Sequence, residues 1–319
     1  MNTFHFRGLS CAIVLLAASA PAGAQAPQAP AHVAPPVVKE GTTVKLSEHV
    51  YVIPDAKVPM VPNVGIIVGS KGTLVVDPGM GLRSGQVVLR EIAKVSKNTD
   101  VMIVNTHYHS EHTTGEAAFP AGTKIVRAAA QQKELEELGM AHVARFRSVS
   151  STVAEVLEGI TSFRAPTEIF EREKVLDLGS VRVRLLWLGP GHTIGDTAVF
   201  VEDDRVLFSG DLAMKGVFPV FSSPQASGRV WLASLDQLEK FQPHTVIGAH
   251  FPITDASVIN DYRGYLKSLQ ARVAELKKEG KSSDDTAVQV RAEFAKKYPD
   301  WAQPIRAHTA STVLYKEAE

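Results

Sequence analysis

Three histidines and a carboxylate fall within six consecutive residues, His107-Tyr108-His109-Ser110-Glu111-His112. The apolar run 101–104 precedes them, which indicates that a buried strand leads into this loop. His107 and His109 are two residues apart, so on extended backbone both side chains project to the same side. Imidazole nitrogens are common zinc ligands, and a carboxylate adds charge and an oxygen ligand. The stretch therefore predicts a metal site, against the alternative of a polar loop that is merely rich in histidine.

Further candidate ligands follow other apolar, strand-like runs. His192, Asp211 and His250 each come directly or shortly after such a run, with Gly or Pro close by. In an α/β sandwich the strand ends at one sheet edge converge, so ligands distant in sequence can meet there. The candidate metal ligands are His107, His109, Glu111, His112, His192, Asp211 and His250.

The elements that position these residues can be outlined from the apolar periodicity. The predicted strands cover residues 50–53, 63–68, 73–76, 101–105, 124–127, 181–187, 197–201, 205–208 and 245–248. The predicted helices cover 84–95, 228–241, 256–279 and 283–298, with a helical insertion over about 128–160 that is broken near Gly139. We expect one α/β domain over 41–319, closed by the last two helices.

The first residues are predicted to be removed from the mature protein. Residues 1–24 have the pattern of a secretory signal peptide, with Arg7, an apolar run over 12–18 and an A-x-A cleavage site at 22–24. The apolar run is too short to span a bilayer, so no membrane anchor is expected after cleavage. Residues 25–40 are rich in Ala and Pro and are predicted to be a linker. We therefore expect a secreted, periplasmic protein.

The composition limits the partners and the metal ligands that this chain can have. The chain has 319 residues, 45% of them hydrophobic, which is ample for a large core. Its 34 basic and 34 acidic residues balance, and no basic stripe indicates binding to nucleic acid. Cys11 is the only cysteine and would leave with the signal peptide, so metal ligands must be His, Asp and Glu. A small-molecule substrate is the expected partner, and nothing in the sequence indicates an oligomeric state.

The histidine-rich string resembles the H-x-H-x-D-H signature of the metallo-β-lactamase superfamily of metal-dependent hydrolases. His192, Asp211 and His250 stand in that family's order, and Asp77 resembles its early Asp-x-Gly turn. The absence of a cysteine ligand and the presence of Asp211 are similar to the class B3 and glyoxalase II-like branch. The resemblance covers residues 45–255 and implies a four-layer αββα sandwich, in which helices flank two mixed sheets and the metals lie at one edge.

The resemblance also implies a role for each candidate residue. Two zinc ions are expected, with iron or manganese as alternative metals. The implied ligands are His107, His109 and His192 for the first ion, and Glu111, His112 and His250 for the second. Asp211 would bridge both ions, and Asp77 would orient a ligand histidine. Glu111 stands where the family has Asp, so this chain departs from the pattern at the second metal.

The implied function is that of an exported zinc-dependent hydrolase. A metal-bound hydroxide would attack a small carbonyl substrate, with ester, thioester, lactone and β-lactam all chemically compatible. Glu111 and Asp211 are the expected catalytic carboxylates, and Lys215 is a candidate for contacting a substrate carboxylate. His142 is expected to have a packing or surface role. The alternatives are a mononuclear-iron sulfur dioxygenase on the same fold and a non-catalytic metal-binding accessory protein.

Overall fold

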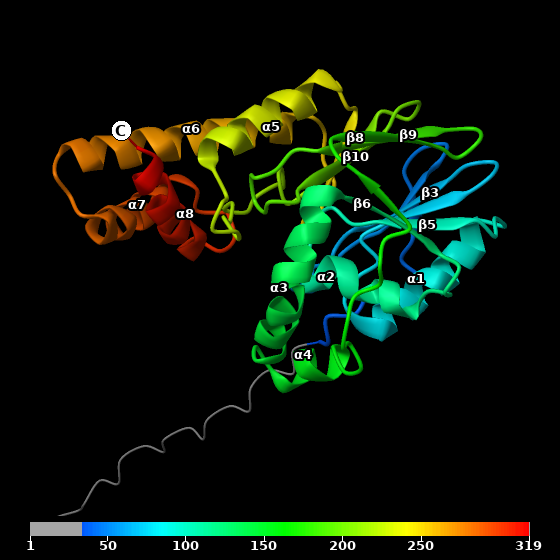
Figure 1. The fold of residues 1–319 in the computed structure, drawn as a ribbon. Coiled ribbons are helices and arrows are strands. Elements are labelled where there is room, and N and C mark those ends of the chain that lie inside the picture. The colour runs from blue at the N-terminus through cyan, green and yellow to red at the C-terminus, as the bar shows by residue number, and fades with distance from the viewer. Residues whose placement is uncertain (1–33, 319) are drawn as a thin grey trace, which may run out of the picture. The chain divides into compact units, whose positions relative to one another are not determined.

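The computed structural model describes residues 34–318, and Figure 1 shows their arrangement. The predicted signal peptide over 1–24 and most of the predicted linker lie outside the described residues. The compact unit begins at Pro35. Val38 is already buried against the first helix layer, so packing starts a few residues before the predicted boundary at 41. Among the described residues no helix combines the length and apolarity that a membrane span requires.

The first sheet is mixed and has the strand order β1-β2-β3-β4-β5-β6-β7. Its strands are β1 (Val44–Lys45), β2 (Val50–Ile53), β3 (Val64–Val68), β4 (Thr73–Val76), β5 (Val101–Val104), β6 (Lys124–Ala128) and β7 (Glu168–Phe170). The first four strands are antiparallel neighbours, whereas β4, β5, β6 and β7 run parallel. The hairpins predicted from the strand-turn-strand pattern near the N-terminus are therefore confirmed.

The second sheet has the order β12-β11-β10-β9-β8. Its strands are β8 (Glu173–Asp177), β9 (Arg182–Trp187), β10 (Thr197–Val201), β11 (Val206–Gly210) and β12 (Thr245–Gly248). β10 is antiparallel to both β9 and β11, and β12 is parallel to β11. Strands β9, β11 and β12 consequently run in the same direction, so their carboxyl ends lie at one edge of the sheet.

Helices cover the outer faces of both sheets. They are α1 (Gly81–Val95), α2 (Ser110–Thr113), the 3₁₀ turn η1 (Thr114–Ala118), α3 (Ala129–Arg147), α4 (Ser151–Val156), α5 (Gly228–Lys240), α6 (Ser257–Lys278), α7 (Ser283–Lys297) and α8 (Ile305–Glu317). Helix α1 packs on the first sheet and α5 and α6 pack on the second, whereas α7 and α8 pack against α6, as Figure 1 shows.

Alternating burial along the strands explains the layering. In β3, Ile66 packs toward α1, whereas its neighbour Ile67 packs into the cluster shared by the two sheets. Successive side chains on a strand point to opposite faces, so a strand that is apolar throughout must be covered on both sides. β3, β4, β10 and β11 are such strands. The resulting order of layers, helix, sheet, sheet, helix, is the predicted αββα sandwich.

Among the helices, α3 and α8 differ from the sequence-based predictions. Helix α3 runs through Gly139 without a break. The glycine leaves room for the Phe163 ring, which would lie 2.7 Å from an added Cβ. The break comes after Arg147 instead. A third C-terminal helix, α8, follows the two that were predicted; its buried face consists largely of small residues such as Ala307 and Ala310, which give a weak apolar periodicity.

Candidate metal centre

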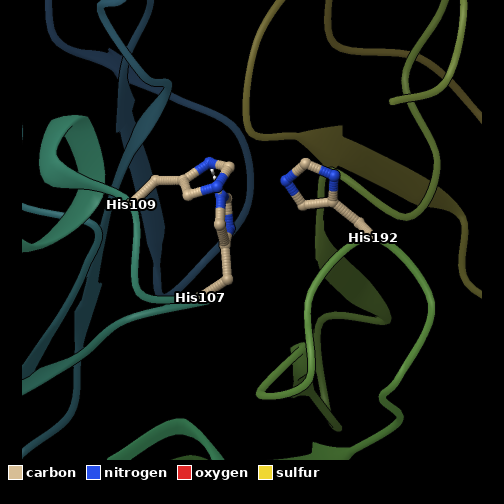
Figure 2. Close-up of side chains that lie close together, drawn as sticks. All are labelled: His107, His109 and His192. Carbon is tan, nitrogen blue, oxygen red and sulfur yellow. Dashed lines mark hydrogen bonds between the residues drawn. The ribbon is translucent and has the colours of Figure 1, made fainter. Parts of the chain in front are cut away.

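The ends of four strands bring the candidate ligands together. After β5 the chain passes through His107 and His109 into α2, which carries Glu111 and His112. The remaining candidates follow β9, β11 and β12, and are His192, Asp211 and His250. All of these side chains are buried except that of His250, which is partly buried. Figure 2 shows the rings of His107 and His109 facing that of His192, which comes from the opposite sheet.

Close contacts join the two sheets at this edge. The backbone N–H of Thr197 donates to the carbonyl of Thr106 at 2.7 Å. Gly210 packs so tightly on Thr106 that an added Cβ would lie 2.9 Å from the threonine Cβ, and its φ of +57° also favours glycine. Because Asp211 directly follows this glycine, the close approach sets the carboxylate beside the histidine-rich loop.

The separations between donor atoms match those of ligands on shared cations. His107 Nε2 lies 3.0 Å from His109 Nδ1, and His192 Nε2 lies 3.5 Å from Asp211 Oδ2. Two nitrogens on one tetrahedral zinc, each about 2.0–2.1 Å from the metal, are about 3.3 Å apart. Ligand atoms lie within 4.8 Å of one another in the groups His107-His109-His192, Glu111-His112-His250 and His107-His112-Asp211. The first two groups are the predicted ligand sets, and the third connects them through Asp211.

Backbone carbonyls fix the tautomers of two ligand histidines. His192 Nδ1 lies 2.6 Å from the carbonyl oxygen of Val220, and His250 Nδ1 lies 2.8 Å from that of Val61. A carbonyl oxygen only accepts, so each Nδ1 carries the proton and each Nε2 keeps its lone pair. An imidazole in this state presents Nε2 to a metal ion.

Asp77 fixes the tautomers of histidines in the histidine-rich loop. Its carboxylate accepts hydrogen bonds from the Thr106 N–H and hydroxyl, both at 2.7 Å, and from His112 Nδ1 at 3.0 Å. Since the Thr106 hydroxyl donates to Asp77, its oxygen accepts from His107 Nδ1 at 3.1 Å. One buried carboxylate thereby leaves the Nε2 lone pairs of both His107 and His112 directed into the cluster.

Several buried atoms in the cluster have no hydrogen-bond partner among the described residues: Glu111 Oε2, His112 Nε2, His192 Nε2 and Asp211 Oδ1. An unsatisfied buried polar atom costs about 1–3 kcal/mol, so such a concentration is unfavourable for the protein alone. Imidazole nitrogens and carboxylate oxygens are the donor set that zinc accepts, and iron and manganese also take it. The residues present therefore fit a metal centre.

The pKa shifts of the buried groups are consistent with a metal centre. Burial and the neighbouring imidazoles hold the pKa of His107 and His109 well below the ordinary histidine value. Burial raises the pKa of Glu111 to about 7. Burial also opposes a charge on His112, but the Asp77 carboxylate outweighs it and raises the pKa of His112 to about 9. A cation at Glu111 and His112 would replace that proton, so metal binding is expected to release protons.

Two further buried carboxylates hold the loop that carries His192. Asp196 accepts from the backbone N–H groups of Gly191, His192 and Thr193, at 3.1, 2.7 and 3.1 Å. Glu134, on α3, accepts from the next two backbone N–H groups along the chain. Sequence analysis missed both residues. The signal for Asp196 was present, because an aspartate placed just after a Gly-His-Thr turn commonly accepts from successive backbone N–H groups.

Two basic side chains near the cluster have different surroundings. Lys215, the candidate substrate contact, is exposed, and its charge acts on Asp255, which is not one of the ligands. Arg306, on α8, lies closer: its charge acts on His192, Asp211 and His250, and its Nη1 donates to the Phe218 carbonyl at 3.2 Å. Sequence analysis missed Arg306 because α8 itself was not predicted.

His142 was expected to have a packing or surface role, but it lies in the centre. Its ring stacks on that of His109, with centroids 4.3 Å apart and planes inclined by 7°. One of its ring nitrogens lies within 4.8 Å of both a His109 nitrogen and a Glu111 carboxylate oxygen. It comes from α3, more than thirty residues beyond the ligand loop, so no local motif marked it.

Asp77→Asn is expected to weaken metal binding by about 10–100-fold, the usual effect of losing a partner that orients a metal ligand. The amide keeps the size of the side chain and tolerates the residue's φ of +55°. It cannot accept from all three donors, however, so the tautomer of His112 is no longer fixed. Competition with a chelator measures the affinity. Asp100→Asn, an exposed aspartate paired with Lys124, is the control, and equal affinities in both variants would contradict the role given to Asp77.

The chain belongs to the metallo-beta-lactamase superfamily, since that family's model matches residues 58–250, more than half of its length. Solved structures agree on the fold. A metallo-beta-lactamase from Pontibacter korlensis has a TM-score of 0.57 at 18% identity, covering 70% of this chain and 98% of its own. The inverting sec-alkylsulfatase Pisa1 from Pseudomonas sp. has a TM-score of 0.65 at 16% identity, covering 86% of this chain and 50% of its own.

Curated relatives by sequence are hydrolases. A linear primary-alkylsulfatase of Pseudomonas sp. (strain ATCC 19151) is 25% identical over 214 residues, 58% of this chain and 40% of the relative. The human acyl-coenzyme A thioesterase MBLAC2 is 28% identical over 171 residues, 48% of this chain and 59% of the relative. A hydroxyacylglutathione hydrolase of Methylococcus capsulatus is 27% identical over 220 residues, 66% and 72% of the two chains. The chain thus spans about half the length of the first two relatives.

Proposed function

We propose that this protein is a zinc-dependent hydrolase of a small carbonyl substrate, with a thioester as the first candidate. The observation that carries the proposal is the convergence of the buried Nε2 atoms of His107, His112 and His192, each on a ring whose Nδ1 is held by a hydrogen bond. Sites of this kind, with titratable groups strongly perturbed by burial and by one another, are typical of catalytic centres. Two ions are proposed, held by the two ligand sets with Asp211 between them.

Zinc bound at such a site lowers the pKa of a coordinated water and polarises a carbonyl oxygen. Side chains of the protein would position the water and accept its proton. The unpaired Glu111 Oε2 and Asp211 Oδ1 are carboxylate oxygens within the cluster, where they can orient a water molecule and accept its proton. Burial excludes bulk solvent around them, which strengthens every charge interaction in the site.

The relatives guide the choice of substrates. One is named as a thioesterase, which places thioesters first among the ester, thioester, lactone and β-lactam classes. A sulfate ester is the second candidate, because an alkylsulfatase matches more than half of this chain. The guanidinium of Arg306, whose charge acts on Asp211 and whose Nη1 donates to the Phe218 carbonyl, would suit an anionic substrate of either kind.

A substrate panel combined with metal analysis tests the proposal. The panel contains butanoyl-coenzyme A, p-nitrophenyl acetate, a homoserine lactone, nitrocefin and p-nitrophenyl sulfate. We expect two zinc ions per chain after purification without added metal, and turnover of butanoyl-coenzyme A above the others. One iron per chain with oxygen consumption would instead support the sulfur dioxygenase alternative. Two zinc ions without turnover of any substrate would support the non-catalytic accessory protein.

Glu111→Asp is expected to keep or raise kcat/KM, because the shorter carboxylate restores the residue that the family carries at this position. Glu111→Gln is the matched variant, since it keeps the length and removes the charge; it is expected to lose one zinc ion per chain. Metal content and kcat/KM are measured on both. Loss of metal from the aspartate variant would show that this site requires the longer side chain.

Export is the remaining part of the proposal. The signal-peptide pattern of residues 1–24 supports it. Fractionation of cells expressing the full chain, followed by N-terminal sequencing of the mature protein, tests this directly. Periplasmic material beginning near residue 25 is the expected result, and an uncleaved cytoplasmic chain would refute export.

A further inference from the structure

His142 differs from the ligand histidines in its tautomer. Its Nδ1 lies 3.2 Å from the backbone N–H of Ser110 and 2.9 Å from the hydroxyl of the same residue. A backbone N–H can only donate, so Nδ1 must be the unprotonated acceptor and the proton must be on Nε2. The histidines at 107, 112, 192 and 250 have the opposite arrangement, with Nδ1 protonated and Nε2 free.

This tautomer makes His142 a donor and not a metal ligand. Its nitrogens belong to a group with His109 and Glu111 that has the spacing of a metal site. Nδ1 is already occupied by Ser110, however, and Nε2 has no lone pair while it carries the proton. A third metal position at this group is therefore disfavoured.

The donor has no acceptor within the described residues. His142 is 6% exposed, and its Nε2 is buried without a hydrogen-bond partner. The ring is held on both faces, by His109 at 4.3 Å and by Phe146 at 4.3 Å, so it cannot readily turn to find one. An unsatisfied N–H on a ring held this rigidly within the candidate centre is arranged to meet an atom that is not part of the chain.

We propose that His142 is a substrate-binding residue whose Nε2–H donates a hydrogen bond to an acyl or carboxylate oxygen of the bound molecule. This inference rests on the proposed function, because it assigns a substrate contact at the same site. The position fits such an oxygen. The His142 ring stacks on His109, which belongs to the first ligand set, and one of its nitrogens lies within 4.8 Å of a carboxylate oxygen of Glu111, which belongs to the second.

Two substitutions separate this role from a structural one. In His142→Asn the amide oxygen takes the place of Nδ1 and keeps the acceptor for Ser110, but nothing takes the place of Nε2. In His142→Gln the amide nitrogen reaches the place of Nε2, and the acceptor for Ser110 is lost. A substrate contact predicts that Asn is the more damaging substitution, whereas a purely structural role predicts the reverse. His244→Asn, at an exposed histidine outside the centre, is the control.

The first measurement is nitrogen-15 NMR of the zinc-loaded full chain, with the His142 signals assigned from the asparagine variant. We expect a protonated Nε2 and an unprotonated Nδ1 both before and after zinc is added. A zinc-dependent loss of the Nε2 proton would identify His142 as a metal ligand and overturn the proposal.

The second measurement is binding of butanoate, a carboxylate probe, to the zinc-loaded protein by calorimetry. We expect the Kd to rise about tenfold in His142→Asn, the cost of one hydrogen bond to a charged group, and by less in His142→Gln. Unchanged binding in the asparagine variant, or no binding by the native chain, would overturn the proposal. A lower kcat with unchanged butanoate binding would indicate that His142 Nε2–H donates to a water molecule and not to the substrate. This result would also overturn the proposal.

The two proposals fail in different ways. If no substrate of the panel is turned over but the asparagine variant still weakens butanoate binding, the proposed reaction is wrong and the contact at His142 stands. If the panel is turned over and the asparagine variant behaves like the native chain, the reaction stands and the contact is wrong.

Discussion

His192→Ala is expected to lower kcat/KM by about 10³-fold or more, since about 4 kcal/mol of transition-state stabilisation is a modest share of what a bound metal supplies. His192 is the only member of the first ligand set that comes from the second sheet. Its loss leaves the first ion with two histidines from a single loop and the shared Asp211, so this ion loses its only imidazole from the second sheet. The zinc content of the variant should fall together with its activity.

Steady-state kinetics with butanoyl-coenzyme A and metal analysis of the same samples measure both effects. His244→Ala is the matched control, because this histidine is exposed and follows the helix that precedes β12. If the native chain turns over the thioester and His192→Ala retains full activity, the catalytic site lies elsewhere in the protein.

Glu116→Ala is expected to destabilise the folded protein by about 3–5 kcal/mol, the usual result of removing one partner from a buried ion pair. Glu116 forms an ion pair with Arg127, and both side chains are almost completely buried. Glu116 also accepts from the backbone N–H of Arg164 at 3.1 Å. It lies in η1, directly after the short helix that carries two ligands, so its loss should also loosen the ligand loop.

Urea denaturation of the metal-loaded protein measures this change. Glu155→Ala removes one partner of an exposed ion pair with Arg83 and should cost about 1 kcal/mol or less. Replacing Glu116 and Arg127 together by methionine should recover part of the loss, because no buried charge is then left unpaired. Equal stability of Glu116→Ala and Glu155→Ala would show that the buried pair contributes little.

Most of the sheet and helix elements follow from local patterns. Apolar alternation located β9, and continuous apolar runs located β3, β4 and β11, because strand burial repeats every second residue and requires no knowledge of the partner strand. Strands β7 and β8 were not predicted. They are short or largely exposed, as in Glu173–Asp177, so little apolar pattern marks them. Helix α8 was missed for a related reason, since small residues form its buried face.

The sequence by itself determined which potential metal ligands occur together and at which strand ends they lie. The spacing of His107 and His109, and the recurrence of His and Asp after apolar strands, already pointed to a metal centre at a strand edge. These features are local, because a strand end and a ligand side chain are set by neighbouring residues. The same local reading named the candidate ligands that the structure brings together, whereas the place of Asp77 beside them was implied by the family resemblance.

Only the tertiary structure decided what each nitrogen does. The carbonyls of Val61 and Val220 leave Nε2 of their histidines free, whereas the Ser110 N–H leaves the proton on Nε2 of His142. Such hydrogen bonds join residues up to 189 positions apart, and a backbone carbonyl has the same chemistry whatever its side chain. No residue type or spacing can therefore reveal them, and only the packing of loops and helices around the cluster distinguishes a free Nε2 from a protonated one.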